Sequence, residues 1–311
     1  MSEFYHVSVL LDECLDGLNI KPNGIYVDGT LGGAGHSSQI AKRLTTGRLI
    51  GIDRDQVALA AAGERLAPYG DRVTLVHSNF CEIAQVLEQL EIPGVDGILL
   101  DLGVSSPQLD DGERGFSYMA DAPLDMRMNR NDALSAYEVV NSWSYEELRR
   151  ILYDYGEERY APKIAAAICA RREVKPIETT LELVEIIRGA MPAAALREKQ
   201  HPAKRSFQAI RIAVNDELGS VEKVMRDAVG CLNPGGRLAI ITFHSLEDRI
   251  VKNGMADAAK GCTCPPNFPV CVCGKKPKVK LVNKKPIVSG DEELERNPRA
   301  RSAKLRVCEK L

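Results

Sequence analysis

Short apolar runs alternate with helical segments through the first hundred residues, and this alternation most constrains the fold. Helical spacing is found at 37–44, 56–66 and 81–90. The strand-like runs are at 24–28, 48–53, 72–77 and 97–101, with another at 237–243. Runs that are apolar nearly throughout are typical of parallel strands covered on both faces. The sequence therefore predicts an α/β fold with a doubly wound, mostly parallel sheet.

The alternation stops after Asp101. Helical patterns follow at 136–140, 145–153, 162–173 and 180–191. A long helix is then expected from Phe207 to a turn at 233–236, and 304–309 reads as a last strand, antiparallel at or near the sheet edge. We expect a discontinuous cofactor domain at 1–109 and 206–311, and an inserted helical substrate-recognition domain at 110–205. The crevice between two such domains is the natural ligand site.

Charge and hydropathy narrow the class of protein. The 311 residues carry a net charge of −2, and no apolar run approaches the roughly 18 residues of a membrane span. The start shows no basic stretch followed by an apolar one, so we expect a cytoplasmic protein with no membrane association. Residues 275–306 hold eleven Lys and Arg against four Asp and Glu. This basic tail fits either nucleic-acid binding or a solvated linker.

A glycine-rich turn follows the first expected strand. Its glycines are Gly29, Gly32, Gly33 and Gly35, which is not the G-x-G-x-x-G spacing of dinucleotide binders. Glycines at such a turn let the backbone and the amides of the next helix approach a ligand.

Polar or aromatic residues stand at four successive strand ends. Asp28 could accept from a cofactor ammonium and Asp53 from ribose hydroxyls, although either could instead cap the next helix. Phe80, beside Asn79, could cover an adenine face or belong to the core, and Asp101 ends the fourth strand. Because the carboxyl ends of parallel strands share one edge, these groups predict a site for a nucleotide-like cofactor.

Longer motifs carry a family resemblance. They lie at 6–13, 28–37, 51–55, 101–110, 114–117, 123–128, 155–159, 207–212, 242–249 and 297–302. Through them nearly the whole chain resembles the bacterial ribosomal small-subunit RNA (cytosine-N4)-methyltransferase family (RsmH/MraW). The resemblance implies a class I S-adenosylmethionine (AdoMet) fold and methyl transfer to the N4 amine of a cytidine in the decoding region of 16S ribosomal RNA. The implied partner is that RNA in an assembled or nearly assembled subunit, and a homodimer is left open.

The resemblance also implies the cofactor residues. Carried over by position, they are Gly33, Ala34, Gly35, His36, Asp53, Phe80, Asp101 and Gln108. Gln108 and His36 are included only because the resemblance implies them. Competing interpretations are an NAD-dependent dehydrogenase, a DNA amino-methyltransferase and a non-catalytic RNA-binding factor. The glycine spacing, the loop after the fourth strand and the whole-chain resemblance disfavour them.

The catalytic hypothesis concerns the loop after the fourth strand. Many amino-methyltransferases place Asp, Asn or Ser there, followed by two prolines and an aromatic residue, whereas this chain has Ser105-Ser-Pro-Gln108. We expect Asp101, Ser105 and Ser106 to hold the target amine, the alternative being that Asp101 binds only AdoMet. His244 would take a proton or contact RNA, unless it belongs to a helix cap centred on Ser245.

Two further groups of residues remain open to interpretation. Arg114, Phe116, Arg127 and Arg130 could grip a displaced RNA strand or form a solvated face. Four cysteines, spaced C-x-C-x₆-C-x-C, could close a structural zinc site or belong to a reduced loop able to form disulfides; they are Cys262, Cys264, Cys271 and Cys273. No metal is expected in catalysis.

Overall fold

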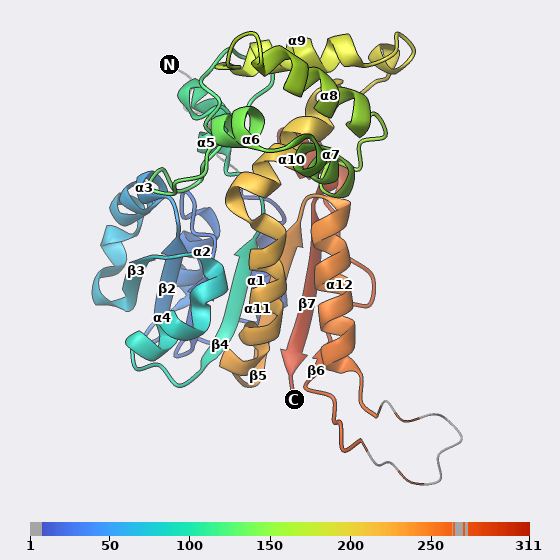
Figure 1. Ribbon diagram of the computed structural model, residues 1–311. Helices are drawn as coiled ribbons and strands as arrows, with labels where there is room; N and C mark the ends of the chain where they lie inside the picture. The colour runs from blue at the N-terminus through green and yellow to red at the C-terminus, as the bar shows by residue number, and fades with distance from the viewer. Residues whose placement is uncertain (1–7, 263, 265–269, 271–272) are drawn as a thin grey trace. The chain divides into compact units, whose positions relative to one another are not determined.

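The computed structural model describes residues 8–262, 264, 270 and 273–311, which divide into two compact units (Figure 1). The first comprises Met1–Gly103 and Leu218–Leu311, and the second comprises Val104–Glu217. None of the described helices combines the length and the apolar character that crossing a membrane would require.

A seven-stranded sheet forms the centre of the first unit within the described residues. Its order is β3-β2-β1-β4-β5-β7-β6. The strands are β1 (Ile25–Asp28), β2 (Arg48–Asp53), β3 (Val73–His77), β4 (Val95–Asp101), β5 (Leu232–Thr242), β6 (Val279–Leu281) and β7 (Lys304–Lys310). β7 pairs antiparallel with β5 and β6, and the other pairs are parallel. The predicted last strand is therefore confirmed, one position in from the edge.

Helices cover both faces of this sheet. Tyr26 and Leu49 pack on one face, against α1 (Leu11–Leu18), α2 (Gly35–Arg43) and α3 (Gln56–Leu66). Val27 and Ile50 pack on the other face, against α4 (Ile83–Gln89), α11 (Glu217–Cys231) and α12 (Ser245–Ala259), which lie on the viewer's side in Figure 1. Successive side chains of a strand point to opposite faces, so strands buried on both faces read as continuous apolar runs. The predicted doubly wound fold is confirmed.

The register of the central strands aligns their carboxyl ends. Asp28, the last residue of β1, lies opposite Gly51 on β2 and Leu99 on β4. Asp53 and Asp101 each end their strand two residues further along. The pairing therefore brings all three carboxyl groups to one edge of the sheet.

Helices with a common apolar core make up the second unit. They are α5 (Ser106–Asp110), α6 (Ala136–Ser142), α7 (Tyr145–Asp154), α8 (Ala161–Arg172), α9 (Thr180–Ala190) and α10 (Lys204–Asn215). The helices predicted between 136 and 191 are confirmed. Asn215 donates to Met126 O and accepts from Met128 N, both at 2.8 Å, and so anchors the segment before α6 on α10.

Two expectations about the later chain were wrong. The helix predicted from Phe207 to the 233–236 turn is broken at Asp216, whose left-handed backbone (φ 44°) ends α10 before α11 begins. Because Phe207 and Ile210 pack in the core of the second unit, α10 lies there and not in the cofactor domain we expected from residue 206.

The turn expected at 233–236 is instead part of β5, at an irregularity in its pairing with β4. The short α13 (Asp291–Arg296) precedes β7.

Candidate active site

The glycine-rich turn joins β1 to α2 and is bonded to both neighbours of β1. The Gly29 N–H donates to Leu99 O of β4 at 2.9 Å, and the Leu31 N–H donates to Ile52 O of β2 at 3.1 Å. Ala34 is the N-cap of α2 in a left-handed conformation (φ 58°), and its side chain makes no cap hydrogen bond. The sheet therefore fixes where the turn lies.

The glycines of this turn are needed for different reasons. A Cβ on Gly29 would lie 2.5 Å from Leu100 Cδ2, and one on Gly35 would lie 1.9 Å from Ser8 Oγ. Gly33 is exposed, and none of the described atoms lies within 4 Å of its would-be Cβ. Packing accounts for the first two glycines. The space at Gly33 is open, which leaves room for the close approach of a ligand; the contact of Gly33 with a cofactor stays a prediction.

Two of the strand-end carboxyl groups accept hydrogen bonds from the turn. Asp28 is buried and accepts from Ser37 Oγ at 2.7 Å and from Thr30 N at 3.2 Å. Asp53 accepts from Gly32 N and Asp55 N, each at 2.8 Å. Burial raises the pKa of both groups to about 6, and the hydrogen bonds oppose that rise. The cap of α3 is Asp55, so the alternative cap role of Asp53 is wrong.

The third carboxyl group, Asp101, has an unused acceptor. Its backbone N–H donates to Thr30 Oγ1 at 2.6 Å. Oδ1 is buried and accepts no hydrogen bond from the described part of the chain, although a quarter of the side chain is exposed. Burial, together with the charges of Asp28 and Glu247, raises the pKa of Asp101 to about 8. Sequence analysis did not name Thr30 as a site residue. The signal that could have found it is a hydroxyl side chain inside the glycine-rich turn.

His36 and Phe80 complete the cluster around the turn. His36 is buried, with Nε2 3.0 Å from Val9 O and Nδ1 3.8 Å from Asp101 Oδ2. Phe80 packs against the sheet core, and its Cβ lies 3.0 Å from the would-be Cβ of Gly29. The structure thus brings together every cofactor residue predicted in the first unit. Their contact with a cofactor stays a prediction.

Ser105 and Gln108 belong to the second unit and form a capping box. Ser105 Oγ accepts from Gln108 N at 3.4 Å, and Gln108 Oε1 accepts from Ser105 N at 3.1 Å. Gln108 is buried. These bonds give both residues a structural task at the start of α5, beside the functional roles that we predict. The side chain of Ser106 lies outside what the structure describes.

His244 is the N-cap of α12, where we had expected Ser245. Its ring accepts from Glu247 N at 3.5 Å, and Nε2 lies 3.1 Å from Glu247 Oε1. Glu247 is buried and also accepts from Phe243 N at 3.0 Å. The cap at Ser245 was therefore wrong, because an imidazole nitrogen fills the position that a hydroxyl commonly takes. A catalytic role for His244 stays a prediction.

Two of the residues expected to grip RNA are buried in the second unit. Arg114 donates to Arg127 O at 2.9 Å and to Met128 O at 3.0 Å, and its guanidinium lies 5.8 Å from the Phe116 ring centroid. Arg114 and Phe116 are 3% and 6% exposed, so that expectation was wrong for both. Arg127 is held by Asp125 at 2.8 Å. The half-exposed Arg130 is still suited to phosphate contact.

Comparison with known proteins gives matches along the whole chain. The sequence model of the MraW methylase family matches residues 3–311. The ribosomal RNA small subunit methyltransferase H of Brevibacillus brevis is 61% identical over 309 residues, covering 99% of this chain and 98% of the relative. That of Heliobacterium modesticaldum is 59% identical over 310 residues, covering 99% of both. A solved rRNA methylase from Streptococcus thermophilus aligns at a TM-score of 0.42 and 10% identity, over 96% of this chain and 95% of that one.

Replacing Gly33 tests the open space in the turn. We expect Gly33→Ala to weaken AdoMet binding about tenfold or more, because an added methyl group in a close contact costs about 1–3 kcal/mol. The folded chain should keep its melting temperature, since no described atom lies near the new methyl group. Isothermal titration calorimetry with AdoMet measures the affinity.

Gly230→Ala is the matched control for that substitution. Gly230 lies on α11 of the same unit, also with open space around its would-be Cβ, so the affinity should not change. Equal affinities of the two variants would contradict the assignment of Gly33 to the ligand site.

The raised pKa of Asp101 predicts how stability depends on pH. The unfolded chain releases this proton near the ordinary value of 3.8, whereas the folded chain keeps it until about 8. The folded state therefore binds more protons between these values, so this stabilising contribution is complete below about pH 4 and is lost as pH rises through about 8. Between these pH values the free energy of unfolding of the wild type should therefore fall. That of Asp101→Asn should fall by roughly 1–3 kcal/mol less, as measured by urea unfolding. The exposed Asp12→Asn should follow the wild type; identical pH profiles of all three proteins would contradict the prediction.

Proposed function

The chain belongs to the MraW methylase family, and on that premise we propose that it methylates the exocyclic N4 amine of a cytidine in the decoding region of 16S ribosomal RNA. Its sheet is that of a class I methyltransferase, and AdoMet is its cofactor. The shared name of the relatives, ribosomal RNA small subunit methyltransferase H, supports small-subunit RNA as the substrate. The proposed RNA is part of an assembled or nearly assembled subunit, which places the reaction in the cytoplasm.

The observation that carries this proposal is the gathering of three carboxyl groups at one glycine turn. Asp28, Asp53 and Asp101 come from three adjacent strands, and one of them has a buried oxygen with no partner in the described chain. AdoMet carries a sulfonium and an ammonium group, both positive. Acidic groups at the carboxyl ends of parallel strands suit such a ligand, and the open space at Gly33 leaves room for it.

The residues around the turn divide the task of holding AdoMet. Asp53 ends the second strand, where a carboxylate binds ribose hydroxyls in related sheets. Phe80 lies beside the turn and offers an apolar ring for the adenine. The backbone at Gly33, Ala34 and Gly35 faces the remaining part of the ligand. This division follows from the strand that each residue ends or follows.

The chemical difficulty lies in the nucleophile. AdoMet supplies a methyl group that is already activated on sulfur, whereas the N4 lone pair of cytosine is delocalised into the ring. The protein must therefore align the amine and help its lone pair to localise, so that positioning dominates. We assign this to Asp101, whose Oδ1 accepts a hydrogen bond from the amine, assisted by Ser105 and Ser106. A carboxyl group with a pKa of about 8 is also suited to take the proton that the methylated amine loses.

Recognition of the RNA is assigned to the inserted helical unit and the basic tail. A base must leave its stack before N4 can reach a pocket. Arg130 in the second unit is half-exposed, and the lysines at 275–285 precede β7. Phosphate contacts from such side chains would make binding depend on salt concentration.

Substitution of Asp101 and of Asp53 separates alignment from cofactor binding. Asp101→Asn should lower kcat about 100-fold or more while AdoMet affinity stays within about twofold, because it removes an acceptor that matters in the transition state. Asp53→Asn should weaken AdoMet binding about tenfold with little change in kcat. In the wild type, kcat should rise as pH passes through about 8, and Asp101→Asn should lose that dependence. Steady-state kinetics measures kcat and its pH dependence, and calorimetry measures the AdoMet affinity. If Asp101→Asn lost AdoMet affinity but kept the kcat of the wild type, Asp101 would bind AdoMet alone.

The methylated product decides the proposed reaction. Purified chain, AdoMet and small subunits from cells lacking this protein should yield N4-methylcytidine at one position of the 16S RNA, identified by mass spectrometry of its nucleosides and nuclease fragments. Asp101→Asn protein is the matched negative control. Methylation at another atom or base, or activity on DNA alone, would overturn the proposal.

A further inference from the structure

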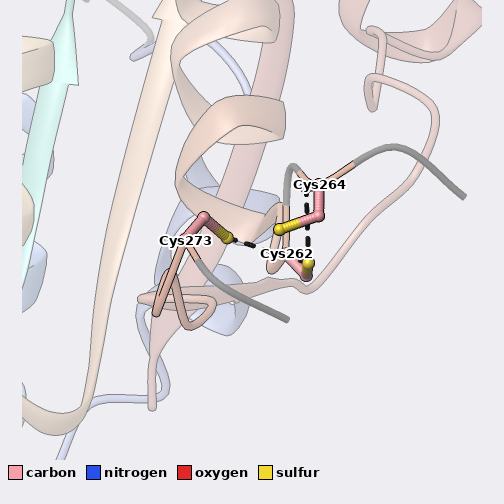
Figure 2. Close-up of side chains that lie close together, drawn as sticks. All are labelled: Cys262, Cys264 and Cys273. Carbon is pink, nitrogen blue, oxygen red and sulfur yellow. Dashed lines mark hydrogen bonds between the residues drawn. The ribbon is translucent and has the colours of Figure 1, made fainter. Parts of the chain in front are cut away.

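Three cysteine thiols gather in the segment between α12 and β6 (Figure 2). Cys273 Sγ lies 3.7 Å from Cys262 Sγ, and the Cys264 N–H donates to Cys262 Sγ at 3.4 Å. The three sulfur atoms all lie within 4.8 Å of one another. The proposed methyl transfer uses none of these thiols, so their arrangement calls for another explanation.

The spacing of the sulfur atoms fits a tetrahedral metal ion. Zinc–thiolate bonds of about 2.3 Å at a tetrahedral angle place two sulfurs ~3.8 Å apart. The Cys262–Cys273 separation already has this value, and Cys264 needs to move by at most about an ångström. A backbone N–H already lies against Cys262 Sγ, which holds that sulfur toward Cys264.

The ends of the segment are joined by the protein itself. The Lys278 N–H donates to Ala258 O at 2.8 Å, which ties the start of β6 to the end of α12. A Cβ on Gly261 would lie 3.3 Å from Pro277 Cδ, so the two arms are in close contact next to Cys262. Because the loop is already closed at its base, bringing the thiols together costs less conformational entropy.

The exposure of these thiols also sets them apart. Cys14 and Cys308 are buried core residues, whereas Cys262 and Cys273 are exposed and Cys264 is partly buried. Cysteines are ordinarily among the most buried residues. A cluster of exposed thiols is explained by reactivity or metal binding more readily than by packing.

We propose that Cys262, Cys264 and Cys273 bind one zinc ion as thiolates. Thiolate ligands select soft or borderline cations, and zinc accepts the tetrahedral geometry without redox chemistry. Water or another chain group completes the four ligands; Cys271 lies outside the described residues, and the three named thiolates suffice for the site. Lys275, Lys276 and Lys278 follow directly in the sequence, and positive side chains close to thiolates would reduce the cost of gathering their negative charges. The ion would fix the segment that leads into these lysines.

Metal analysis of the full chain tests this site. Protein purified under reducing conditions, without chelator or a histidine tag, should contain about one zinc ion per chain by mass spectrometry. Cys262→Ser and Cys273→Ser should each retain less than about a tenth of an ion. Cys169→Ser, which removes a partly buried thiol on α8, is the matched control and should keep the full amount.

Cobalt provides a second measurement that needs no variant. Zinc-free wild-type chain titrated with Co²⁺ alone should show thiolate-to-cobalt charge-transfer absorption and the intense visible bands of a tetrahedral ion. Equal zinc contents in the wild type and the two serine variants would overturn the proposal. So would a wild type that binds neither ion, or one in which Cys262 and Cys273 are joined in a disulfide without metal.

Discussion

The parallel pairing of β1 with both β2 and β4 is the constraint on which the candidate active site depends. β1 has only four residues. The next two strands in the chain, β2 and β3, lie on one side of it, and β4 and β5 lie on the other. Open α/β sheets bind ligands at the point where the strand order reverses in this way. The Gly29 and Leu31 amides bond to the two neighbouring strands, so the turn takes its position from the sheet. A shift of one residue in either pairing would move Asp53 or Asp101 to the other face of its strand.

Burying three carboxyl groups at that edge costs free energy unless their oxygens accept hydrogen bonds, and the protein supplies only some of the donors. Hydrogen bonds from Ser37, Thr30 and Gly32 hold Asp28 and Asp53. Asp101 receives no such bond on Oδ1 from the described residues, and its pKa is the highest of the three. A buried acceptor without a partner is costly in a stable fold, and such costs tend to occur at functional sites. The N–H group of the proposed substrate amine is the kind of donor that meets this need for a partner at Oδ1.

Sequence reasoning succeeded where local pattern and topology agree. The strands that end in Asp28, Asp53 and Asp101 could be found because doubly buried strands are apolar throughout and stop at a polar residue. Sequence reasoning failed where tertiary contacts override the local sequence pattern. Asp216 breaks a helical pattern through a left-handed backbone, and Arg114 is buried because backbone carbonyls satisfy its guanidinium. The cap at His244 was missed because Ser245 is the commoner residue type for that position.

The path of the chain separates the thiol cluster from methyl transfer. α12 begins just after the carboxyl end of β5, where the candidate active site lies, and runs for fifteen residues, about 22 Å. Its last turn is tied to Lys278, which leads into β6, and β6 pairs with the final residues of β7. Because β7 is antiparallel to β5, those residues lie at the amino ends of the parallel strands. The three thiols therefore stand at the far edge of the sheet from Asp101, too distant to act on a methyl group, and an ion there stabilises the loop rather than the reaction.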